Sequence, residues 1–500
     1  MIRIMKKRQK KLYRRFRMKD ERAFRKELEE TLQLNNNTET EPFRQQFHLT
    51  PPKGLLNDPN GLIQWRGIYH VFFQWMPFKT GHGSKWWGHA TTKDWVNWEL
   101  LPPALAPVQD FEKNGCYSGS AVVRDGLLQL FYTGNVKDEY GNRSSYQCLA
   151  VSEDGVHFEK LGPVISQPER YTAHFRDPKV WYEAGSWWLV IGAQRDDKEG
   201  HVLIYRSRDL RKWEFLGPLA GKGVTLSESF GFMWECPDFF ELDGMRVLLV
   251  SPQGLEKESY QYQNQYQTGV FTGSFDSENA TFSHGSFQEM DKGFEFYAPQ
   301  TFEDEHGRRL LLGWMGVPDQ QEDMHPTIKD GWVHCLTMPR ELLHLQNGKI
   351  AQQPLKEWKQ LRGAQQSKDI HVTAETVEWT EWKAIVAEIN IEVEEGKSWT
   401  ISWRDYLTMS FDAEYGVFTL ERPDLISGEP AFRTSRIEEI HSLRCYFDRS
   451  SAEIFINDGE HVATSRLFPR KQEAKLRCKT HESIMFQVDA WELHSFQWSG

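Results

Sequence analysis

The segment TTKDWVNWELL (residues 91–101) has the same pattern as two later segments, VSEDGVHFEKL (151–161) and SRDLRKWEFL (207–216). In each segment a serine or threonine is followed by one spacer residue, an aspartate, three further residues, an aromatic residue and a glutamate. The aspartates of successive copies are 60 and 55 residues apart, and GSFDSENATF (273–282) is a weaker fourth copy. Four-stranded units that recur every ~50–65 residues are typical of a β-propeller.

Pairs of short apolar and aromatic runs, each pair joined by a glycine-containing turn, lie between the copies of this pattern. GLIQWRGIYHVFFQW (61–75) and KVWYEAGSWWLVIGAQ (179–194) are examples, and each predicts a strand, a tight turn and a second strand. Residues 47–350 have room for five such four-stranded units. The sequence therefore predicts a five-bladed β-propeller, with a β-sandwich carrying irregular insertions as the alternative.

The predicted fold class is all-β, with a short N-terminal helix. Residues 1–26 carry thirteen Lys or Arg against two acidic residues, which is typical of a solvated basic helix. After the propeller, QQPLKEWKQLRG predicts a short helix, and strands with turn signals about every ten residues then predict a sandwich. The predicted parts are 1–40 (basic N-terminal helix and linker), 41–350 (five-bladed β-propeller), 351–366 (linker helix) and 367–500 (C-terminal β-sandwich).

Composition excludes several classes of protein. The mean hydropathy is −0.63, and no apolar run reaches the ~18–20 residues that a membrane-spanning helix needs. The net charge of −11 argues against nucleic acid as the main partner. The six cysteines form no CxxC pair, and no apolar stretch follows the N-terminal charges as in a secretory signal. We therefore expect a cytoplasmic protein without a membrane partner.

Three acidic residues are the strongest candidates for chemistry. Asp58 lies in GLLNDPNG, Asp177 in AHFRDPKVW and Glu235 in GFMWECPDFF, and each begins a hairpin in what we interpret as three successive parts of the repeat. The innermost strands of propeller blades line a central cavity, so these acids can converge. Carboxylates that share a pocket cannot all remain ionised, so one has a raised pKa and can serve as an acid at neutral pH. A glycosidase needs such a pair: one carboxylate attacks, and another donates and later removes a proton.

A simpler interpretation applies to each acid taken singly. An aspartate before proline is commonly a turn residue whose side chain bonds its own backbone. Glu235 fits this interpretation least, because a glutamate between tryptophan and cysteine belongs to no simple turn. The 20 tryptophans are likewise explained either by core packing or by stacking on sugar rings.

The motifs NDPNG, RDP and EC, in this order after HLTPPKGLLNDPNG (48–61), resemble the signature of glycoside hydrolase family 32. The resemblance extends over roughly residues 45–470 and includes GCYSGSAV, EFYAPQTF and SAEIFINDGEHVATSRLFP. It implies a five-bladed propeller followed by a β-sandwich. It also implies hydrolysis of the β-fructofuranosidic bond of sucrose 6-phosphate or sucrose, with a fructan hydrolase or a non-catalytic sugar-binding protein as alternatives.

The resemblance also implies roles for the three acids. Asp58 would be the nucleophile, Glu235 the general acid and then the base, and Asp177 would stabilise the transition state. Arg176 would shape the charge of the pocket. A retaining mechanism requires the carboxyls of Asp58 and Glu235 to lie about 5–5.5 Å apart. No metal or organic cofactor is implied, and the expected partner is a small disaccharide that binds a monomer or homodimer.

Further residues are carried over from the family as contacts to the sugar. Trp87 and Tyr117 are as well explained by a structural role, and Cys236 is expected to tune its surroundings rather than react. Met76 and His82 stand where the family usually has other residues. Arg143, Arg195 and His201 are candidates to bind a phosphate. The substrate-binding residues expected from the resemblance are Leu55, Leu56, Asn57, Gln74, Trp87, Tyr117, Ser118, Arg176 and Trp314.

Overall fold

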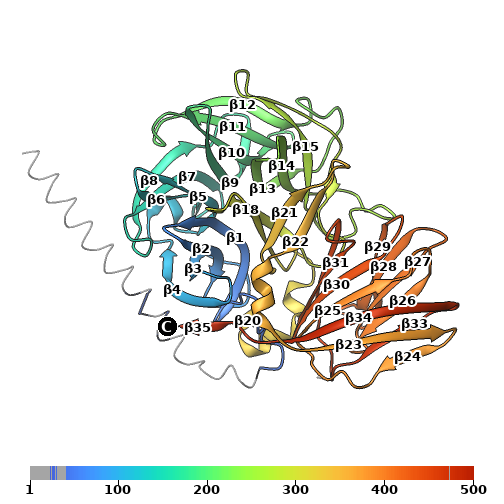
Figure 1. Cartoon of the computed structure of the whole chain (residues 1–500). Coiled ribbons are helices and arrows are strands. Elements are labelled where there is room, and N and C mark those ends of the chain that lie inside the picture. The colour runs from blue at the N-terminus through green and yellow to red at the C-terminus, as the bar shows by residue number, and fades with distance from the viewer. Residues whose placement is uncertain are drawn as a thin grey trace, which may run out of the picture.

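The computed structural model shows an all-β protein in which a propeller stands beside a sandwich (Figure 1). The residues that the structure describes are 41–471 and 473–499, with Ala23, Arg25, Lys26, Leu28 and Glu30. These five early residues are helical, and the rest of the predicted N-terminal helix and linker lies outside the described residues. Within the described part, no helix is both long enough and apolar enough to span a membrane.

Five sheets in the described part of the chain form the blades of the propeller. In each blade the strands pair antiparallel in the order given below, except that the last strand of blade 4 pairs with the third strand of that blade. The strands are, in blade 1, β1 (Gly54–Trp65), β2 (Ile68–Met76), β3 (Trp86–Thr92) and β4 (Asn97–Leu105); in blade 2, β5 (Cys116–Arg124), β6 (Leu127–Lys137), β7 (Arg143–Ser152) and β8 (Glu159–Ser166); in blade 3, β9 (Tyr171–Glu183), β10 (Ser186–Arg195), β11 (Gly200–Ser207) and β12 (Trp213–Gly221); in blade 4, β13 (Met233–Leu242), β14 (Met245–Gln253), β15 (Gly269–Asp276), β16 (Thr281–His284) and β17 (Gln288–Glu289); and in blade 5, β18 (Tyr297–Glu303), β19 (Arg309–Trp314), β21 (Arg340–His344) and β22 (Ile350–Pro354).

Blade 1 is completed by two strands from distant parts of the sequence. β20 (Trp332–Val333) pairs parallel to β1 on the inner side, and β35 (Gln497–Ser499) pairs parallel to β4 on the outer side. In Figure 1 the red β35 lies next to the blue strands of blade 1. The sheet of the first blade therefore contains residues from the beginning, the middle and the end of the fold.

The repeated aspartates occupy the same position in four blades. Asp94, Asp154 and Asp209 each lie in the turn between the third and fourth strands, and Asp276 ends the third strand of blade 4 directly before that turn. Their carboxylates accept backbone N–H groups from the residues two and three positions later. A carboxylate in this position closes the turn without a glycine. The sequence repeat is thus confirmed as the outer hairpin of successive blades.

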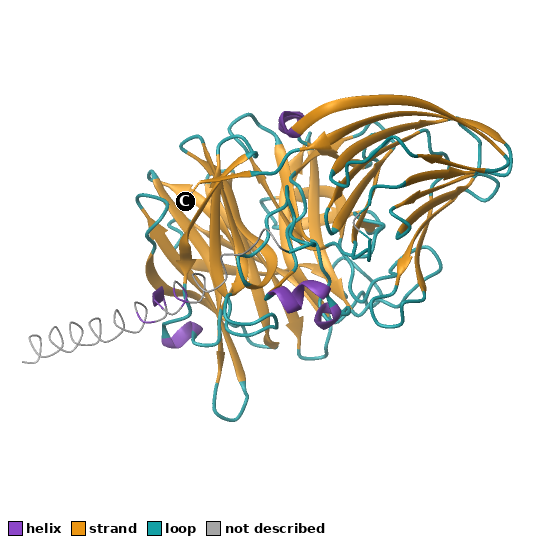
Figure 2. Ribbon diagram, turned by 90° about the horizontal axis from the view of Figure 1, so that it is seen from below, coloured by secondary structure: helices purple, strands orange, loops and turns teal. Residues whose placement is uncertain are grey.

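The predicted linker helix over 351–366 is shorter than expected. The 3-10 helix η5 covers Lys356–Leu361, while β22 extends to Pro354 and β23 begins at Arg362. Both ends of the predicted segment are used in sheets, because β22 pairs with β21 and β23 pairs with a strand of the sandwich. Helices are short segments in a molecule of strands and loops (Figure 2); within residues 41–471 the structure also has η2 (Asp110–Glu112), η3 (Glu322–Met324) and η4 (Pro326–Asp330).

Two six-stranded sheets face each other in the sandwich. Tryptophans 399 and 403 lie between them with aliphatic side chains such as Ile389 and Ile454, which explains part of the high tryptophan content. In spatial order the first sheet contains β23 (Arg362–Thr373), β34 (Ser483–Leu493), β25 (Ala387–Val393), β30 (Ser442–Asp448), β31 (Ser451–Ile456) and β32 (His461–Arg466), and the second contains β24 (Thr376–Trp379), β33 (Leu476–Lys479), β26 (Trp399–Trp403), β27 (Leu407–Asp412), β28 (Val417–Pro423) and β29 (Pro430–Arg436).

A buried network of charged side chains joins the propeller to the sandwich. His48, just before β1, contacts Asp448 and Glu453 of the sandwich through its two ring nitrogens, at 2.9 Å each. Glu453 also accepts two hydrogen bonds from Arg340 of blade 5. Burial opposes a charge on His48, but the two carboxylates outweigh it and raise the pKa of this histidine. The segment that leads into the first blade is therefore fixed from the sandwich side.

Candidate active site

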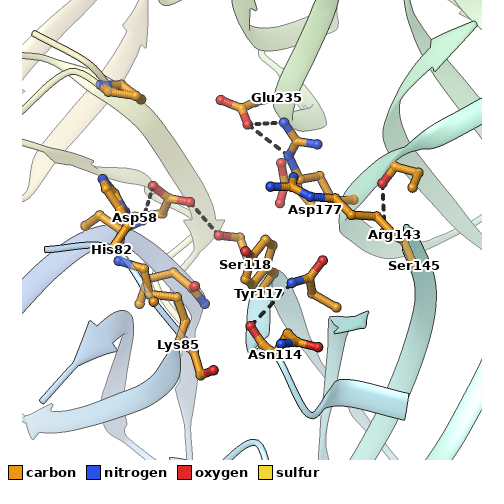
Figure 3. A pocket seen from close by; sticks show the side chains of 18 of the residues that line it. Asp58, His82, Lys85, Asn114, Tyr117, Ser118, Arg143, Ser145, Asp177 and Glu235 are labelled. Carbon is orange, nitrogen blue, oxygen red and sulfur yellow. Dashed lines mark hydrogen bonds and ion pairs between the residues drawn. The ribbon is translucent and has the colours of Figure 1, made fainter. Parts of the chain in front are cut away.

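A pocket of about 440 Å³ opens at the centre of the propeller, and described residues from all five blades line it. Figure 3 shows acidic, basic and hydroxyl side chains directed into this space. Asp58, Asp177 and Glu235 lie together there, as the sequence predicts. They come from β1, β9 and β13, which are the first strands of their blades. The acids of three distant motifs thus meet because the propeller brings its first strands to one axis.

The three acids do not come from three successive blades, which corrects the prediction. Asp58 belongs to blade 1, but Asp177 belongs to blade 3 and Glu235 to blade 4. Blade 2 contributes Tyr117 and Ser118 on β5 instead. The motif GCYSGSAV holds no acid, so a search for acids alone passes over this blade.

An irregularity interrupts the first strand of every blade at the pocket. The pairing register shifts around Asp58 in β1, Ser118 in β5, Asp177 in β9, Cys236 in β13 and Ala298 in β18. Such β-bulges turn a strand locally and re-aim its side chains.

Proline marks four of these five bulges in the described chain. Pro59, Pro178, Pro237 and Pro299 follow the bulged residue directly, where a missing backbone N–H breaks no ladder bond. Asp177 has a φ of 69°, in the left-handed region that costs a non-glycine residue energy and is found mainly where surrounding structure enforces it. Asp58 and Asp177 are therefore bulge residues within strands rather than the turn residues of the simpler interpretation.

Asp58 is held by hydrogen-bond donors. The Ser118 hydroxyl donates to Oδ2 at 2.5 Å, and Nδ2 of Asn57 donates to Oδ1 at 3.0 Å. The Cys236 thiol lies 3.8 Å from Oδ2. Burial raises the pKa of Asp58, the Ser118 hydrogen bond opposes the rise, and the charge of Glu235 adds to it. The donors favour an ionised carboxylate whose position is fixed.

Glu235 has a different set of partners. Arg176 donates two hydrogen bonds to Oε1, at 2.9 and 2.6 Å. Gln253 and the hydroxyl of Tyr297 donate to Oε2, at 2.9 and 2.7 Å. These residues surround Glu235 from blades 3, 4 and 5.

Asp177 is held through its backbone N–H and through one carboxylate oxygen. Its Oδ2 accepts the backbone N–H of Cys236 at 3.0 Å, and its own N–H donates to Thr133. Burial raises the pKa of Asp177 to about 7, Arg176 opposes this rise, and the charges of Glu235 and Asp58 add to it. The free pocket therefore favours the protonated form of this acid more than water does.

Six of the nine expected substrate-binding side chains line the pocket. They are Asn57, Gln74, Tyr117, Ser118, Arg176 and Trp314.

Leu55, Leu56 and Trp87 do not line the pocket. Their side chains are fully buried in apolar clusters, where Leu55 packs against Met76 and Trp87 against Leu130. The Trp87 indole donates to the backbone oxygen of Tyr117 and so joins blades 1 and 2. Their motifs are shared with the family, but these side chains support the strands that carry the site.

Of the three phosphate candidates, only Arg143 lines the pocket. Arg195 forms an ion pair with Asp197 at the surface. His201 is buried, and its ring contacts Tyr171 and the backbone oxygen of Lys222. Neither side chain is directed at the pocket.

Sequence reasoning missed eight polar residues of the pocket wall: Ser84, Lys85, Asn114, Asn135, Lys137, Ser145, Gln253 and Tyr297. Gln253 ends β14 and Tyr297 begins β18, and both bind Glu235. Lys85 precedes β3 and Lys137 ends β6. Tyr297 could have been found because it stands at the position before Ala298-Pro299, as Arg176 and Glu235 stand before their own bulge residue and proline. Among the described residues, no group of His, Cys, Asp or Glu side chains is arranged to hold a metal ion.

Buried carboxylates that separate blades bring together, with hydroxyl and amide donors around them, have the chemistry needed to hydrolyse a glycosidic bond. Models of one family match the chain along most of its length: the Glycosyl hydrolases family 32 N-terminal domain matches residues 48–354, and the Glycosyl hydrolases family 32 C terminal matches residues 347–492. The chain belongs to family 32 of the glycosyl hydrolases.

Individual relatives agree with this family. The sucrose-6-phosphate hydrolase of Bacillus subtilis is 49% identical over 480 residues, which are 95% of this chain and 99% of the relative. The structure of sucrose-6-phosphate hydrolase from Lactobacillus gasseri matches with a TM-score of 0.84 at 32% identity, covering 93% of this chain and 96% of that one. A mutant of the Bombyx mori GH32 β-fructofuranosidase in complex with sucrose matches with a TM-score of 0.82 at 34% identity, covering 96% and 99%.

Proposed function

We propose that this chain hydrolyses the β-fructofuranosidic bond of sucrose 6-phosphate, and of sucrose, by a retaining double displacement. The observation that carries the proposal is the meeting of Asp58, Asp177 and Glu235 in one pocket, each with a different set of partners. The names of the relatives support the substrate, since one is a sucrose-6-phosphate hydrolase and another binds sucrose. The products are fructose and glucose 6-phosphate, or fructose and glucose.

Asp58 is the nucleophile of the proposed mechanism. Its carboxylate accepts hydrogen bonds from Ser118 and Asn57, which favour the ionised form and fix its direction. One carboxylate oxygen attacks the anomeric carbon of the fructosyl unit as the bond to the glucosyl oxygen breaks. A covalent fructosyl-enzyme results, and water releases it in the second step.

Glu235 gives its proton to the leaving glucosyl oxygen and then takes one from the attacking water. In the free pocket Arg176 donates hydrogen bonds to Glu235, while burial raises the pKa of Asp177. Fructosyl hydroxyls that donate to Asp177 favour its ionised form when the sugar binds, and its negative charge then stabilises the transition state. The Arg176 guanidinium then offsets the negative charge that remains on the acids beside the transition state.

The phosphate of sucrose 6-phosphate meets Arg143 and Lys137 in this proposal. They are paired residues at the end of the β6–β7 hairpin and line the same wall of the pocket. Both side chains are exposed, and neither forms an ion pair with a described residue. A guanidinium and an ammonium are suited to bind phosphate oxygens. A phosphosugar made on uptake remains inside the cell, which supports a cytoplasmic enzyme.

The proposed function is tested by kcat/KM for sucrose 6-phosphate, sucrose and inulin, together with NMR of the first fructose released. We expect cleavage of the two disaccharides, with fructose released first as the β-furanose. Inulin as the best substrate would replace the proposal by the fructan-hydrolase alternative. No cleavage of any of the three would favour the sugar-binding alternative.

Replacing Arg143 by methionine tests the phosphate contact. We expect kcat/KM for sucrose 6-phosphate to fall about tenfold or more, a loss of about 1.4 kcal/mol, while the value for sucrose stays unchanged. Arg195→Met is the matched control, because this arginine lies outside the pocket. An equal loss on both sugars would show that Arg143 supports the pocket without reading the phosphate.

A further inference from the structure

A buried lysine in the pocket has no part in the mechanism above. Lys85 is only 4% exposed, although its ammonium lines the pocket. Its backbone oxygen accepts the N–H of Cys116, so blade 2 holds this residue in place at the start of β3. Burying an ammonium costs several kcal/mol unless a partner compensates for it. A buried ammonium at this position is therefore expected to have a compensating partner in the pocket.

Lys85 contacts the proposed nucleophile through Asn57. Its Nζ donates to Oδ1 of Asn57 at 2.6 Å, and Nδ2 of Asn57 donates to Oδ1 of Asp58 at 3.0 Å. Among the described residues this is the one hydrogen bond that the Lys85 ammonium makes. Figure 3 shows Lys85 on the same side of the pocket as Asp58.

The chemistry of the ammonium decides how Asn57 is oriented. An ammonium has three donors and no acceptor, so it can bind only the oxygen of the carboxamide. The amide nitrogen must then point the other way, toward Asp58. A carboxamide without such a partner can turn over, and its oxygen would then face the carboxylate and repel it.

We propose that Lys85 is a positioning residue for the nucleophile: it fixes the carboxamide of Asn57 with the N–H toward Asp58 and places a positive charge behind the carboxylate. The inference rests on the proposed function of Asp58. It assigns to Lys85 no contact with the sugar.

The charge of Lys85 is sensitive to pH. Burial lowers the pKa of Lys85 to about 7, Asp58 and Glu322 oppose this shift, and Lys79 adds to it. The charged form is present below that pH and is lost as the pH rises through it. Below neutral pH the ammonium favours ionised Asp58, and its removal should raise the pKa of that carboxyl.

Lys85→Met and Lys85→Arg test the inference together. Methionine keeps the length of the side chain without donor or charge, whereas arginine remains a donor-only cation. We expect Lys85→Met to lower kcat/KM for sucrose about 100-fold, since a misplaced reacting group costs about that much. The acid limb of the pH profile should move up by about one pH unit, the lower end of the effect of a nearby opposite charge on a carboxyl pKa. Arginine should restore the wild-type acid limb and part of the rate.

The controls separate a positioning role from loss of folding or of function. Lys93→Met removes an exposed lysine of the same blade and should leave kcat/KM and the pH profile unchanged. Lys85→Met should have at least the wild-type Tm, because a buried charge is removed. A wild-type acid limb in Lys85→Met would overturn the inference. If Asp58→Asn were inactive in that same experiment, the proposed function would stand and only the role of Lys85 would be rejected. If Asp58→Asn were active, the proposed function itself would be rejected.

Discussion

Replacing Asp58 by asparagine lowers kcat/KM for both disaccharides by about 10⁴-fold to 10⁶-fold, which is the expected loss when a catalytic nucleophile is removed. Asparagine has the same shape but no negative charge, so it cannot form the fructosyl-enzyme. The pocket itself should persist, because Ser118 can still donate to the amide oxygen. Substrate binding by calorimetry should therefore survive while turnover is lost.

Asp125→Asn is the matched control for this substitution. Asp125 lies exposed in the β5–β6 turn with a φ of 52°, a conformation that asparagine also tolerates. We expect wild-type kcat/KM for this variant. If Asp58→Asn retained more than about one-hundredth of the wild-type rate, the nucleophile would have to be sought elsewhere, since general acid–base effects alone reach about 10²–10⁴-fold.

Glu235→Gln should separate the two steps of the mechanism. For sucrose, whose leaving group needs a proton, we expect kcat/KM to fall about 10³-fold to 10⁴-fold. For an aryl β-fructofuranoside, whose phenolate leaves without a proton, the first step should be affected far less. The second step still lacks its base, so the covalent intermediate should accumulate and be visible in the mass spectrum of the intact protein as one added fructosyl unit.

The same strand supplies a control for Glu235. Glu241 is exposed at the far end of β13, and Glu241→Gln should behave as wild type on both substrates. Equal losses of Glu235→Gln on sucrose and on the aryl fructoside, without an adduct, would mean that Glu235 holds the sugar and does not transfer a proton.

The blade repeat could be predicted from sequence because its signal is local. Each aspartate of the pattern accepts hydrogen bonds from backbone groups two and three residues away. Residues close together in the sequence therefore determine the turn. The alternation of short apolar runs and glycine turns is local in the same sense. The two strands that complete blade 1 could not be found this way, since β20 and β35 are too short to leave a pattern.

The acids of the site were found, but the reason for their geometry was not. A proline after Asp58 and after Asp177 was compatible with a turn, and only the pairing register shows a bulge inside a strand. The sequence contains the repeated proline, but only the register of the partner strands shows that each of these prolines follows a bulged residue. Lys85 was missed because one lysine before WWGH has no pattern; its significance comes from burial and from Asn57.

The pairing of β35 with β4 has a consequence for the way the protein is made. A ribosome synthesises blade 1 early, yet residues 497–499 that cover its outer edge emerge after the other blades and the sandwich. Throughout synthesis β4 is an unpaired edge strand, and Trp98, which packs against Trp498 in the finished protein, lacks that cover. Such edges pair readily with other chains. Nascent chains on one messenger RNA therefore carry at blade 1 an open strand edge that the finished protein no longer has.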